Sequence, residues 1–511
     1  MNTFYAINPV NNERLEGEFS NSTKAEINEA VQKATTAFDI YRKKDNNDIA
    51  DFLNQIAAEI LDLGDALLER CHLETALPLG RLRGERGRTM NQLKLFAELV
   101  REGSWADARI DTAIPDRKPF PKSDIRHILQ PLGAVAVFGA SNFPLAFSVA
   151  GGDTASALAA GCPVVLKGHP AHPGTCEMVA SAFQKAIEKC NMPDGVFSLV
   201  QGNTHEVGQN LVKHSDIKAV GFTGSFRGGK ALFDLANARP EPIPVFAEMG
   251  STNPVFILPN ALKEKGEAIA QGMSNSITLG VGQFCTNPGL TFVENAENTN
   301  EFSQYFAAKM AEKTAETMLT PNIKTAYDNG IQHTTSLDGI TTLATGQNGN
   351  LNHATPQLFQ TSIKHFLENQ ALAEENFGPS SILVVAETKS QILEAAKSLE
   401  GHLTATVHGT PEDFENYKAL FDILEQKVGR IVINGYPTGV EVCHSMVHGG
   451  PFPATTAPQS TSVGTNAIKR FVRPICFQDY PETLLPKALH NNNPMNIWRL
   501  INGEWTKDSV V

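Results

Sequence analysis

Between residues 133 and 237, short and continuously apolar runs alternate with helical segments, and this alternation limits the chain to few folds. The apolar runs cover residues 133–139, 163–167, 196–200 and 219–222, and the helical segments cover 145–160, 173–190, 205–213 and 229–237. A strand that is apolar at every position is typical of a parallel sheet, where both faces are buried. The sequence therefore predicts an α/β domain with helices on the faces of a parallel, Rossmann-type sheet.

A second alternation follows from about residue 245. Its predicted strands cover 254–258, 290–294, 382–385 and 430–434, and its predicted helices cover 263–278, 300–314 and 389–398. We expect a second α/β domain that begins near Glu241-Pro-Ile-Pro244, because clustered prolines interrupt regular structure. Upstream, helical patterns cover 24–71 and 91–100, and the polar, proline-bearing segment 103–130 predicts a surface excursion or a hairpin.

Size and charge exclude several classes of protein. At 511 residues the chain is too long for one simple core. Its formal net charge of -12 gives no basic surface, so nucleic acid is not an expected partner. The N-terminus lacks the pattern of a signal peptide, and no unbroken apolar stretch is long enough to span a membrane. We therefore expect a cytoplasmic protein.

The seven cysteines are scattered along the chain and form no Cys-x-x-Cys pair. This spacing argues against a disulfide framework and against a structural zinc site, so no metal is expected. Each cysteine is then either a small buried apolar residue or a single reactive thiol.

Cys285 is the cysteine with the most unusual surroundings, Gly-Val-Gly-Gln-Phe-Cys-Thr-Asn-Pro-Gly (280–289). Gly280 and Gly282 permit close approach of the backbone to a substrate, and the Asn-Pro-Gly turn can aim successive amides at one point. Amides beside a nucleophile are suited to hold a developing oxyanion. The pattern favours a nucleophile, and an inert buried thiol is the alternative.

Glu248 lies in Phe-Ala-Glu-Met-Gly-Ser (246–251), enclosed by apolar residues and glycine. An unpaired buried carboxylate is costly, so Glu248 is either a functional group or a partner in a salt bridge. If it is buried, its pKa is expected to rise toward neutrality, where a general base works best.

Two predicted strand-to-helix turns carry further candidates. The glycine-rich segment 220–229 ends a predicted strand and begins a predicted helix, which favours a binding site for an anion or a nucleotide. It lacks the G-x-G-x-x-G spacing of the common dinucleotide-binding motif. Asn142 lies in Phe-Gly-Ala-Ser-Asn-Phe-Pro (138–144), where it either caps the helix that Pro144 starts or donates its amide to an oxyanion.

Together these segments resemble the aldehyde dehydrogenase superfamily along nearly the whole chain. The resemblance implies that Cys285 attacks an aldehyde, that hydride passes to a nicotinamide cofactor, and that Glu248 activates the water that hydrolyses the thioester. It implies that Asn142 and the amide of Cys285 hold the oxyanion. It also implies cofactor contacts by Lys167, Gly224, Ser225, Gly229, Glu375 and Phe377.

The cofactor preference is suggested by a departure from the family pattern. Many NAD-preferring members carry a glutamate three positions after the lysine, where this chain has Pro170 in Lys-Gly-His-Pro. Without a carboxylate to repel a 2′-phosphate, the resemblance implies NADP, with NAD possible. Lys167, His169 or His205 would hold the phosphate, although histidine is a weak anchor at neutral pH.

The C-terminal segment 448–476, which begins His-Gly-Gly-Pro-Phe-Pro-Ala-Thr-Thr, narrows the resemblance. It looks like the α-ketoglutarate semialdehyde (2,5-dioxovalerate) dehydrogenases, whose close cousins are the NADP-linked long-chain aldehyde dehydrogenases. The resemblance implies oxidation of that semialdehyde to 2-oxoglutarate, with aliphatic aldehydes as the alternative. His444 and His448 are expected to be structural or pocket-lining rather than catalytic. The candidate aromatic residues of a substrate pocket are Phe143, Phe147, Phe284 and Phe452.

The expected organisation is a cofactor domain over 1–245, a catalytic domain over 246–441, and a return to the cofactor domain with an oligomerisation segment over 442–511. The resemblance implies a homodimer or homotetramer, assembled through a hairpin near 115–132 and the C-terminal segment. The rival interpretations are a CoA-acylating relative, a non-catalytic member of the fold and a thiol hydrolase without cofactor. Glu248 argues against the first, and a hydrolase leaves Lys167 without a role.

Overall fold

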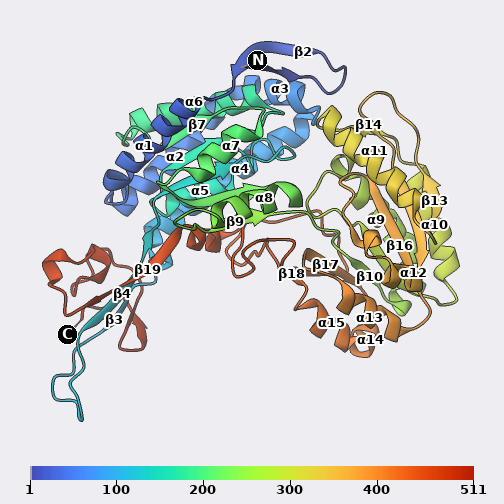
Figure 1. The fold of residues 1–511 in the computed structure, drawn as a ribbon. Helices are drawn as coiled ribbons and strands as arrows, with labels where there is room; N and C mark the ends of the chain where they lie inside the picture. The colour runs from blue at the N-terminus through green and yellow to red at the C-terminus, as the bar shows by residue number, and fades with distance from the viewer. Residues whose placement is uncertain (1–2, 511) are drawn as a thin grey trace.

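The computed structural model describes residues 3–510, and its first domain is built on a five-stranded parallel sheet (Figure 1). The strands, in the order in which they lie, are β7 (Phe197–Val200), β6 (Val164–Lys167), β5 (Ala134–Phe138), β8 (Ile217–Thr223) and β9 (Val245–Glu248). All four neighbouring pairs are parallel. The α/β class and the strands predicted over 133–222 are confirmed.

Both faces of this sheet are covered by helices. Val135 and Val137 of β5 pack into one core, whereas Ala134 and Ala136 pack into the other. This alternation between two cores explains why the strand is apolar at every position. The first core is formed with α2 (Asn46–Asp62), α3 (Gly64–Thr75), α4 (Leu79–Glu102), α5 (Gly152–Ala159) and α6 (Pro173–Lys189). The second is formed with α1 (Lys24–Tyr41), α7 (His205–Lys213) and α8 (Phe226–Asn237).

The second domain contains a seven-stranded sheet, which lies on the right of Figure 1. In spatial order its strands are β13 (Thr341–Thr345), β15 (Gln357–Ser362), β16 (Ser380–Ala386), β11 (Leu290–Glu294), β10 (Val255–Ile257), β17 (His402–His408) and β18 (Val428–Ile433). Only the edge strand β13 is antiparallel to its neighbour among these described strands. The accompanying helices are α9 (Pro259–Thr278), α10 (Thr299–Ala311), α11 (Pro321–Ser336), α12 (Ile363–Glu368), α13 (Lys389–Ser398), α14 (Pro411–Asn416) and α15 (Lys418–Leu424).

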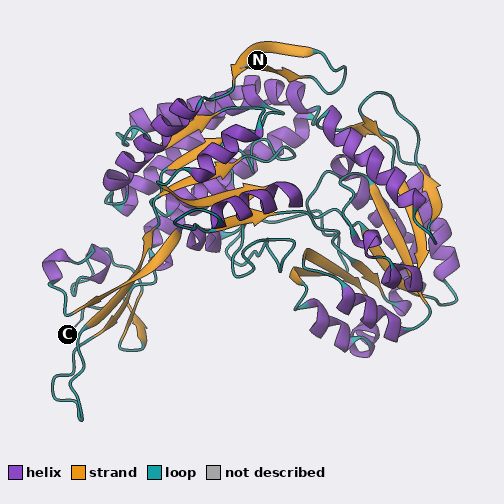
Figure 2. Ribbon diagram, viewed as in Figure 1, coloured by secondary structure: helices purple, strands orange, loops and turns teal. Residues whose placement is uncertain are grey.

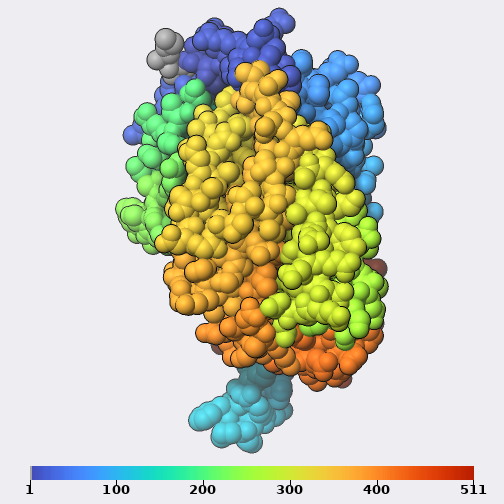
Figure 3. All heavy atoms as spheres, turned by 90° about the vertical axis from the view of Figure 1, so that its right-hand side faces the viewer, coloured from blue at the N-terminus to red at the C-terminus, as the bar shows by residue number. Residues whose placement is uncertain are grey.

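A third sheet projects away from the two domains, and Figure 2 shows its strands at the lower left. Its order is β19 (Val472–Gln478), β4 (Ile125–Pro131), β3 (Arg109–Asp111), β20 (Arg499–Ile501) and β21 (Glu504–Thr506). The chain between β3 and β4 forms the protrusion that Figure 3 shows in cyan at the bottom. The expected hairpin around 115–132 and the segment after 472 therefore belong to one sheet, since β4 pairs with β19.

Several predicted boundaries are wrong. The expected division after residue 245 falls within β9, which pairs with β8, so the first sheet continues to Glu248. The helix predicted over 24–71 is three helices, and the helix predicted from residue 145 begins only at Gly152. Buried apolar residues in the turn at 145–151 produce the helix-like pattern before the helix starts.

Other elements were missed. The pattern predicted no strand over β17, which alternates polar and apolar residues although all of them are buried. The N-terminal hairpin of β1 (Thr3–Ile7) and β2 (Arg14–Ser20) and the small sheet of β12 (Glu316–Thr317) and β14 (His353–Ala354) were also missed. Within residues 3–510, no helix combines the length and the apolar character that crossing a bilayer requires.

Candidate active site

Cys285 lies on the loop between the short 3-10 helix Leu279–Gly282 and strand β11. Gly280, Val281 and Gly282 all have positive φ, so the chain coils tightly before the cysteine. A Cβ on Gly282 would lie 2.3 Å from the carbonyl oxygen of Gly378, which only a glycine permits. Asn253 fixes the other side of the loop, because its side-chain amide donates to the carbonyl of Cys285 at 2.8 Å. The half-buried thiol is thus held on a rigid loop.

The side chains of Cys285, His448 and Glu248 meet at one point. Nε2 of His448 lies 3.4 Å from Sγ of Cys285, within hydrogen-bond range for sulfur, and 2.9 Å from Oε1 of Glu248. Both His448 and Glu248 are buried, and the hydroxyl of Ser462 donates to Oε2 of Glu248. Glu248 ends β9 of the first sheet, whereas His448 and Ser462 come from the segment that returns after β18. Three distant parts of the chain therefore assemble this group.

These three side chains also form the one group of potential metal donors that the described part of the chain brings together, with ligand atoms within 4.8 Å of one another. Sulfur, imidazole and carboxylate are a donor set that zinc accepts. The same three groups are a nucleophile, a proton carrier and a base, which is the arrangement that activated thiol chemistry requires.

The protonation states of the group are coupled. Burial, with the nearby charge of Glu248, raises the pKa of the Cys285 thiol well above its ordinary value. Burial would also raise the pKa of Glu248, but the charge and hydrogen bond of His448 outweigh it and leave that pKa below the ordinary value. The expectation that the pKa of Glu248 rises toward neutrality is therefore wrong for this arrangement. The pattern of apolar neighbours signals burial, but it does not reveal the imidazole that offsets burial.

Asn142 follows β5 and reaches the loop that carries the thiol. Its buried side-chain amide donates to the carbonyl of Gln283 at 3.0 Å, two residues before Cys285. The carbonyl of Asn142 accepts a hydrogen bond from Arg81 of α4 at 2.8 Å. The amide predicted to hold an oxyanion therefore lies beside the nucleophile loop, although no α-helix starts at Pro144 for it to cap.

Three of the four predicted aromatic residues gather next to the thiol. The rings of Phe143 and Phe284 lie 5.3 Å apart, those of Phe143 and Phe147 lie 5.5 Å apart, and Phe147 faces His448 at 6.5 Å. Phe452 is elsewhere: it is 53% exposed and packs edge-on against Phe226 at the start of α8. The aromatic group beside the thiol therefore comprises Phe143, Phe147 and Phe284 but not Phe452. The positions of these residues in the sequence do not show which rings converge in the fold.

The predicted cofactor residues of the first domain lie at the carboxyl ends of β6 and β8, the two strands that flank β5, and nucleotides bind parallel sheets at this edge. Lys167 ends β6, and Gly224 and Ser225 follow β8. Ser225 caps α8, since its hydroxyl accepts a hydrogen bond from the amide of Gly228 at 3.2 Å. Gly229 packs so tightly that a Cβ there would lie 2.7 Å from Met249. Gly224 and Ser225 are exposed, so the start of α8 is open to approach by an anion.

The basic residues near β6 differ in charge. Burial lowers the pKa of Lys167 to about 8, and its ammonium donates to the carbonyl of Gly202. Burial, with the charges of His172 and Lys167, lowers the pKa of His169 well below its ordinary value. At neutral pH Lys167 is therefore still largely protonated, whereas His169 is neutral. Pro170 follows on the same loop, and His205 is exposed at the start of α7.

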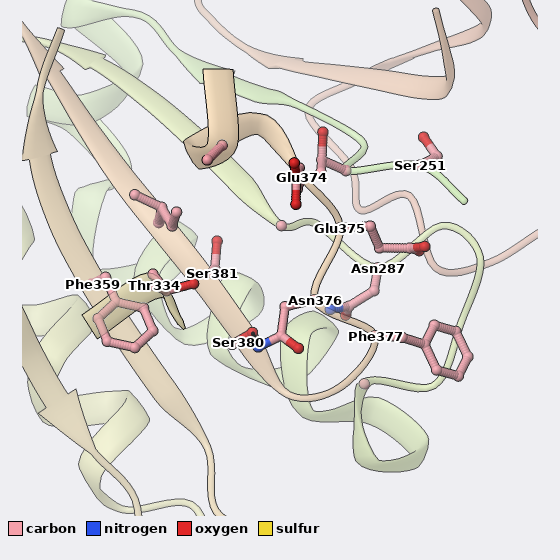
Figure 4. A pocket seen from close by; sticks show the side chains of 15 residues that line it. Ser251, Asn287, Thr334, Phe359, Glu374, Glu375, Asn376, Phe377, Ser380 and Ser381 are labelled. Carbon is pink, nitrogen blue, oxygen red and sulfur yellow. Dashed lines mark hydrogen bonds between the residues drawn. The ribbon is translucent and has the colours of Figure 1, made fainter. Parts of the chain in front are cut away.

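Glu375 and Phe377 line a pocket beside the nucleophile loop (Figure 4). The pocket also includes Gly282 and Asn287 of that loop and Ser251, which follows Glu248 closely. A Cβ on residue 250 would lie 2.2 Å from the carboxylate of Glu375, so Gly250 lets this carboxylate approach the backbone. The two predicted cofactor residues of the second domain thus lie near both reactive side chains.

Sequence reasoning missed the two polar partners of Glu248. His448 was expected to be structural or pocket-lining, but its contacts with both reactive groups favour a catalytic role. The signal in the sequence was its position in His-Gly-Gly-Pro-Phe, where glycines leave room around an imidazole. No local feature of the sequence indicated that Ser462 would contact Glu248. His444 is exposed and has no recorded contact with the group.

His448→Asn is expected to slow alkylation of Cys285 by iodoacetamide at pH 7 roughly tenfold, because the thiol loses the imidazole that lies 3.4 Å from its sulfur and can accept its proton. The rate of alkylation should recover as the pH rises toward the pKa of the thiol. His444→Asn is the control, since this histidine is exposed. Equal alkylation rates in the His448 variant and the unaltered protein would show that the imidazole does not assist the thiol.

The fold and the comparisons with known proteins define the chain as an α/β oxidoreductase of the class that acts on aldehydes with a nicotinamide cofactor. The chain belongs to the aldehyde dehydrogenase family, which matches residues 1–451. It is 49% identical over 504 residues to α-ketoglutaric semialdehyde dehydrogenase 2 of Azospirillum brasilense, covering 98% of this chain and 96% of the relative. It is 46% identical to the α-ketoglutaric semialdehyde dehydrogenase of Acinetobacter baylyi (strain ATCC 33305 / BD413 / ADP1), covering 96% and 93% of the two chains.

Solved structures share the fold at lower identity. Betaine aldehyde dehydrogenase of Staphylococcus aureus, solved in complex with NAD+, superposes with a TM-score of 0.79 at 20% identity, covering 94% of this chain and 93% of that one. Aldehyde dehydrogenase 21 of Physcomitrella patens, solved with its reaction product succinate, gives a TM-score of 0.78 at 20% identity and covers 93% and 94%. The predicted fold and family are confirmed.

Proposed function

We propose that this chain oxidises α-ketoglutarate semialdehyde (2,5-dioxopentanoate) to 2-oxoglutarate with NADP or NAD, through a thioester on Cys285. The substrate is supported by two relatives that bear the name of this activity at 49% and 46% identity over nearly the whole chain. The chemistry is supported by one observation above all, the contact of the Cys285 thiol with His448 and, through it, Glu248.

Each side chain of the site has its own role in the proposed reaction. In its neutral form His448 accepts the proton of Cys285 through Nε2, and the imidazolium so formed pairs with Glu248. The thiolate then adds to the aldehyde carbon to give a thiohemiacetal. The side-chain amide of Asn142 leaves the carbonyl of Gln283 and donates to the new oxyanion. When bound, the nicotinamide cofactor supplies the hydride acceptor. Glu248 then removes a proton from the water that attacks the thioester, and the acid leaves as the thiol is restored.

The cofactor is held by residues of both domains. We assign the pyrophosphate to the start of α8, with Gly224, Ser225 and Gly229, and the nicotinamide ribose to Glu375 with Phe377 nearby. Lys167 contacts the adenosine ribose, beside His169 and Pro170. NADP is favoured because Pro170 carries no charge to repel a 2′-phosphate and Lys167 is still largely protonated at pH 7. His169 contributes a neutral donor rather than a second positive charge.

The projecting sheet is the proposed site of assembly into a homodimer or homotetramer. Its edge strand β19 alternates exposed and half-buried residues, and one side of it pairs with β4. The other side leaves a row of backbone groups for a second copy of the chain. Phe120, at the protrusion before β4, is 74% exposed and adds apolar surface.

A substrate panel tests the proposed function. We expect kcat/KM for 2,5-dioxopentanoate to exceed that for pentanal by roughly 10-fold or more, and NADP to be used at least as well as NAD. The same assays with added CoA report whether an acyl-CoA forms instead of the free acid. A clear preference for pentanal or longer aldehydes would replace the proposed substrate with the aliphatic class, which the aromatic group of Phe143, Phe147 and Phe284 also suits.

A further inference from the structure

Two arginines of α4 lie against the aromatic side chains beside Cys285. The guanidinium of Arg81 lies 5.1 Å from the ring centre of Phe143 and 5.0 Å from that of Phe284. The guanidinium of Arg88 lies 5.8 Å from Phe143 and 5.3 Å from Phe147. Both arginines therefore flank the same ring, and together they bring positive charge to the group that adjoins the thiol.

Arg88 has hydrogen-bond donors that the protein does not use. Its Nε and Nη2 are buried, and no side chain or backbone group among residues 3–510 accepts a hydrogen bond from either. Buried donors in folded proteins are nearly always paired, so this pair requires a partner that the protein itself does not supply. Nε and Nη2 form one edge of the guanidinium, which is the edge that binds both oxygens of a carboxylate.

No neighbouring carboxylate among the described residues accepts a hydrogen bond from the unpaired donors of Arg88. Glu85 lies on α4 between the two arginines and its charge acts on both, but its Oε1 accepts hydrogen bonds from the amides of Leu145 and Ala146 at 2.8 and 3.0 Å, and its Oε2 accepts none from either guanidinium. No carboxylate of the described chain lies within ion-pair distance of Arg81 or Arg88. Arg81 is partly committed, because its Nη2 donates to the carbonyl of Asn142, while its Nη1 lacks a partner in residues 3–510.

A short chain of contacts joins Arg88 to the thiol: its guanidinium lies 5.3 Å from the ring of Phe147, that ring lies 6.5 Å from the ring of His448, and His448 contacts Cys285. Arg88 is close enough to Cys285 for its positive charge to favour the thiolate, although burial has the larger and opposite effect on the thiol pKa. In an extended five-carbon aldehyde acid, the carboxylate lies about 5 to 6 Å from the aldehyde carbon. We expect a molecule of this length to place its aldehyde at the thiol when Arg88 binds its carboxylate.

We propose that Arg88, assisted by Arg81, binds the carboxylate of the aldehyde substrate and selects short aldehyde acids over uncharged aldehydes of the same length. This inference rests on the proposed function, because it takes the substrate to be an oxo acid. It adds the residues that would recognise the acid group. Phe143 and Phe147 contact Arg88 on one side and Phe284 and His448 on the other, and these apolar rings would exclude water from the bound carboxylate, which strengthens a charge-assisted hydrogen bond.

The test compares two substrates that differ only in the acid group, 5-oxopentanoate and pentanal, together with 2,5-dioxopentanoate. In the unaltered protein the acid is expected to have the higher kcat/KM. In Arg88→Met the ratio of kcat/KM for 5-oxopentanoate to that for pentanal should fall by roughly 10- to 100-fold, mainly through the KM of the acid. Arg88→Lys should recover only part of the ratio, because an ammonium cannot bind both oxygens along one edge.

Arg83→Met is the matched control, since Arg83 lies on the same helix but is exposed. An unaltered protein that prefers the acid, combined with an unchanged ratio in both Arg88 variants, would overturn the role of Arg88 and leave the proposed function standing. An unaltered protein without any preference for the acids would overturn both. If Arg88→Met does not fold, Arg88→Lys and the comparison of 5-oxopentanoate with its amide in the unaltered protein decide the question.

Discussion

Replacing Cys285 with alanine is expected to lower kcat for aldehyde oxidation by more than about 10³-fold. No other thiol can substitute, because Cys71, Cys162 and Cys176 are buried and the remaining three have no recorded contact with His448 or Glu248. Without the sulfur there is no covalent intermediate, so the single-turnover burst of reduced cofactor should vanish together with steady-state turnover. Stopped-flow absorbance of the reduced cofactor measures both.

The control is Cys443→Ala, which removes a half-buried thiol from the returning segment. This variant should keep both the burst and the steady-state rate. Cofactor binding by the Cys285 variant, followed by fluorescence titration, shows whether the loss is chemical rather than structural. Retention of a tenth or more of the normal kcat in the Cys285 variant would remove the thioester from the reaction.

The sequence predicted the fold well where burial dictates residue type. Strand β5 is buried and apolar at every position, and β6 is buried throughout and apolar up to its final residue, Lys167, so the pattern there is unambiguous. Strand β17 is also fully buried, but its His402 and Thr404 pair with Ser251 and Asn253, which lie on a loop far from it in the sequence. The polar residues therefore conceal β17 as a buried strand, because the groups that pair with them lie far away in the sequence.

The candidate site was predictable in the parts that local sequence defines. The glycines around Cys285 and the apolar residues around Glu248 reveal a thiol and a carboxylate in constrained surroundings. The partner of both is His448, which lies 163 residues after Cys285, and no local pattern joins them. Arg88 was hidden for another reason, since a charged residue on an amphipathic helix reads as a solvent-facing side chain until the fold shows what covers it.

The second expected result concerns Glu248, whose replacement should leave formation of the thioester intact while its hydrolysis becomes slow. Glu248→Gln removes the base that activates water, so steady-state kcat should fall by about 10²- to 10³-fold. The glutamine also removes a negative charge that raises the pKa of Cys285, so formation of the thioester should persist. The variant is therefore expected to release a burst of reduced cofactor stoichiometric with its active sites and then to stall.

Rapid-quench mass spectrometry should find the acyl group on Cys285 during the stall, and hydroxylamine should release it. Glu59→Gln is the matched control, because Glu59 is also a buried glutamate but lies on α2, where it pairs with Lys189. Its burst and its steady state should match those of the unaltered protein. A Glu248 variant that turns over at the normal rate would assign the base to another group, whereas one that loses the burst as well would place Glu248 before the thioester, in activation of the thiol through His448.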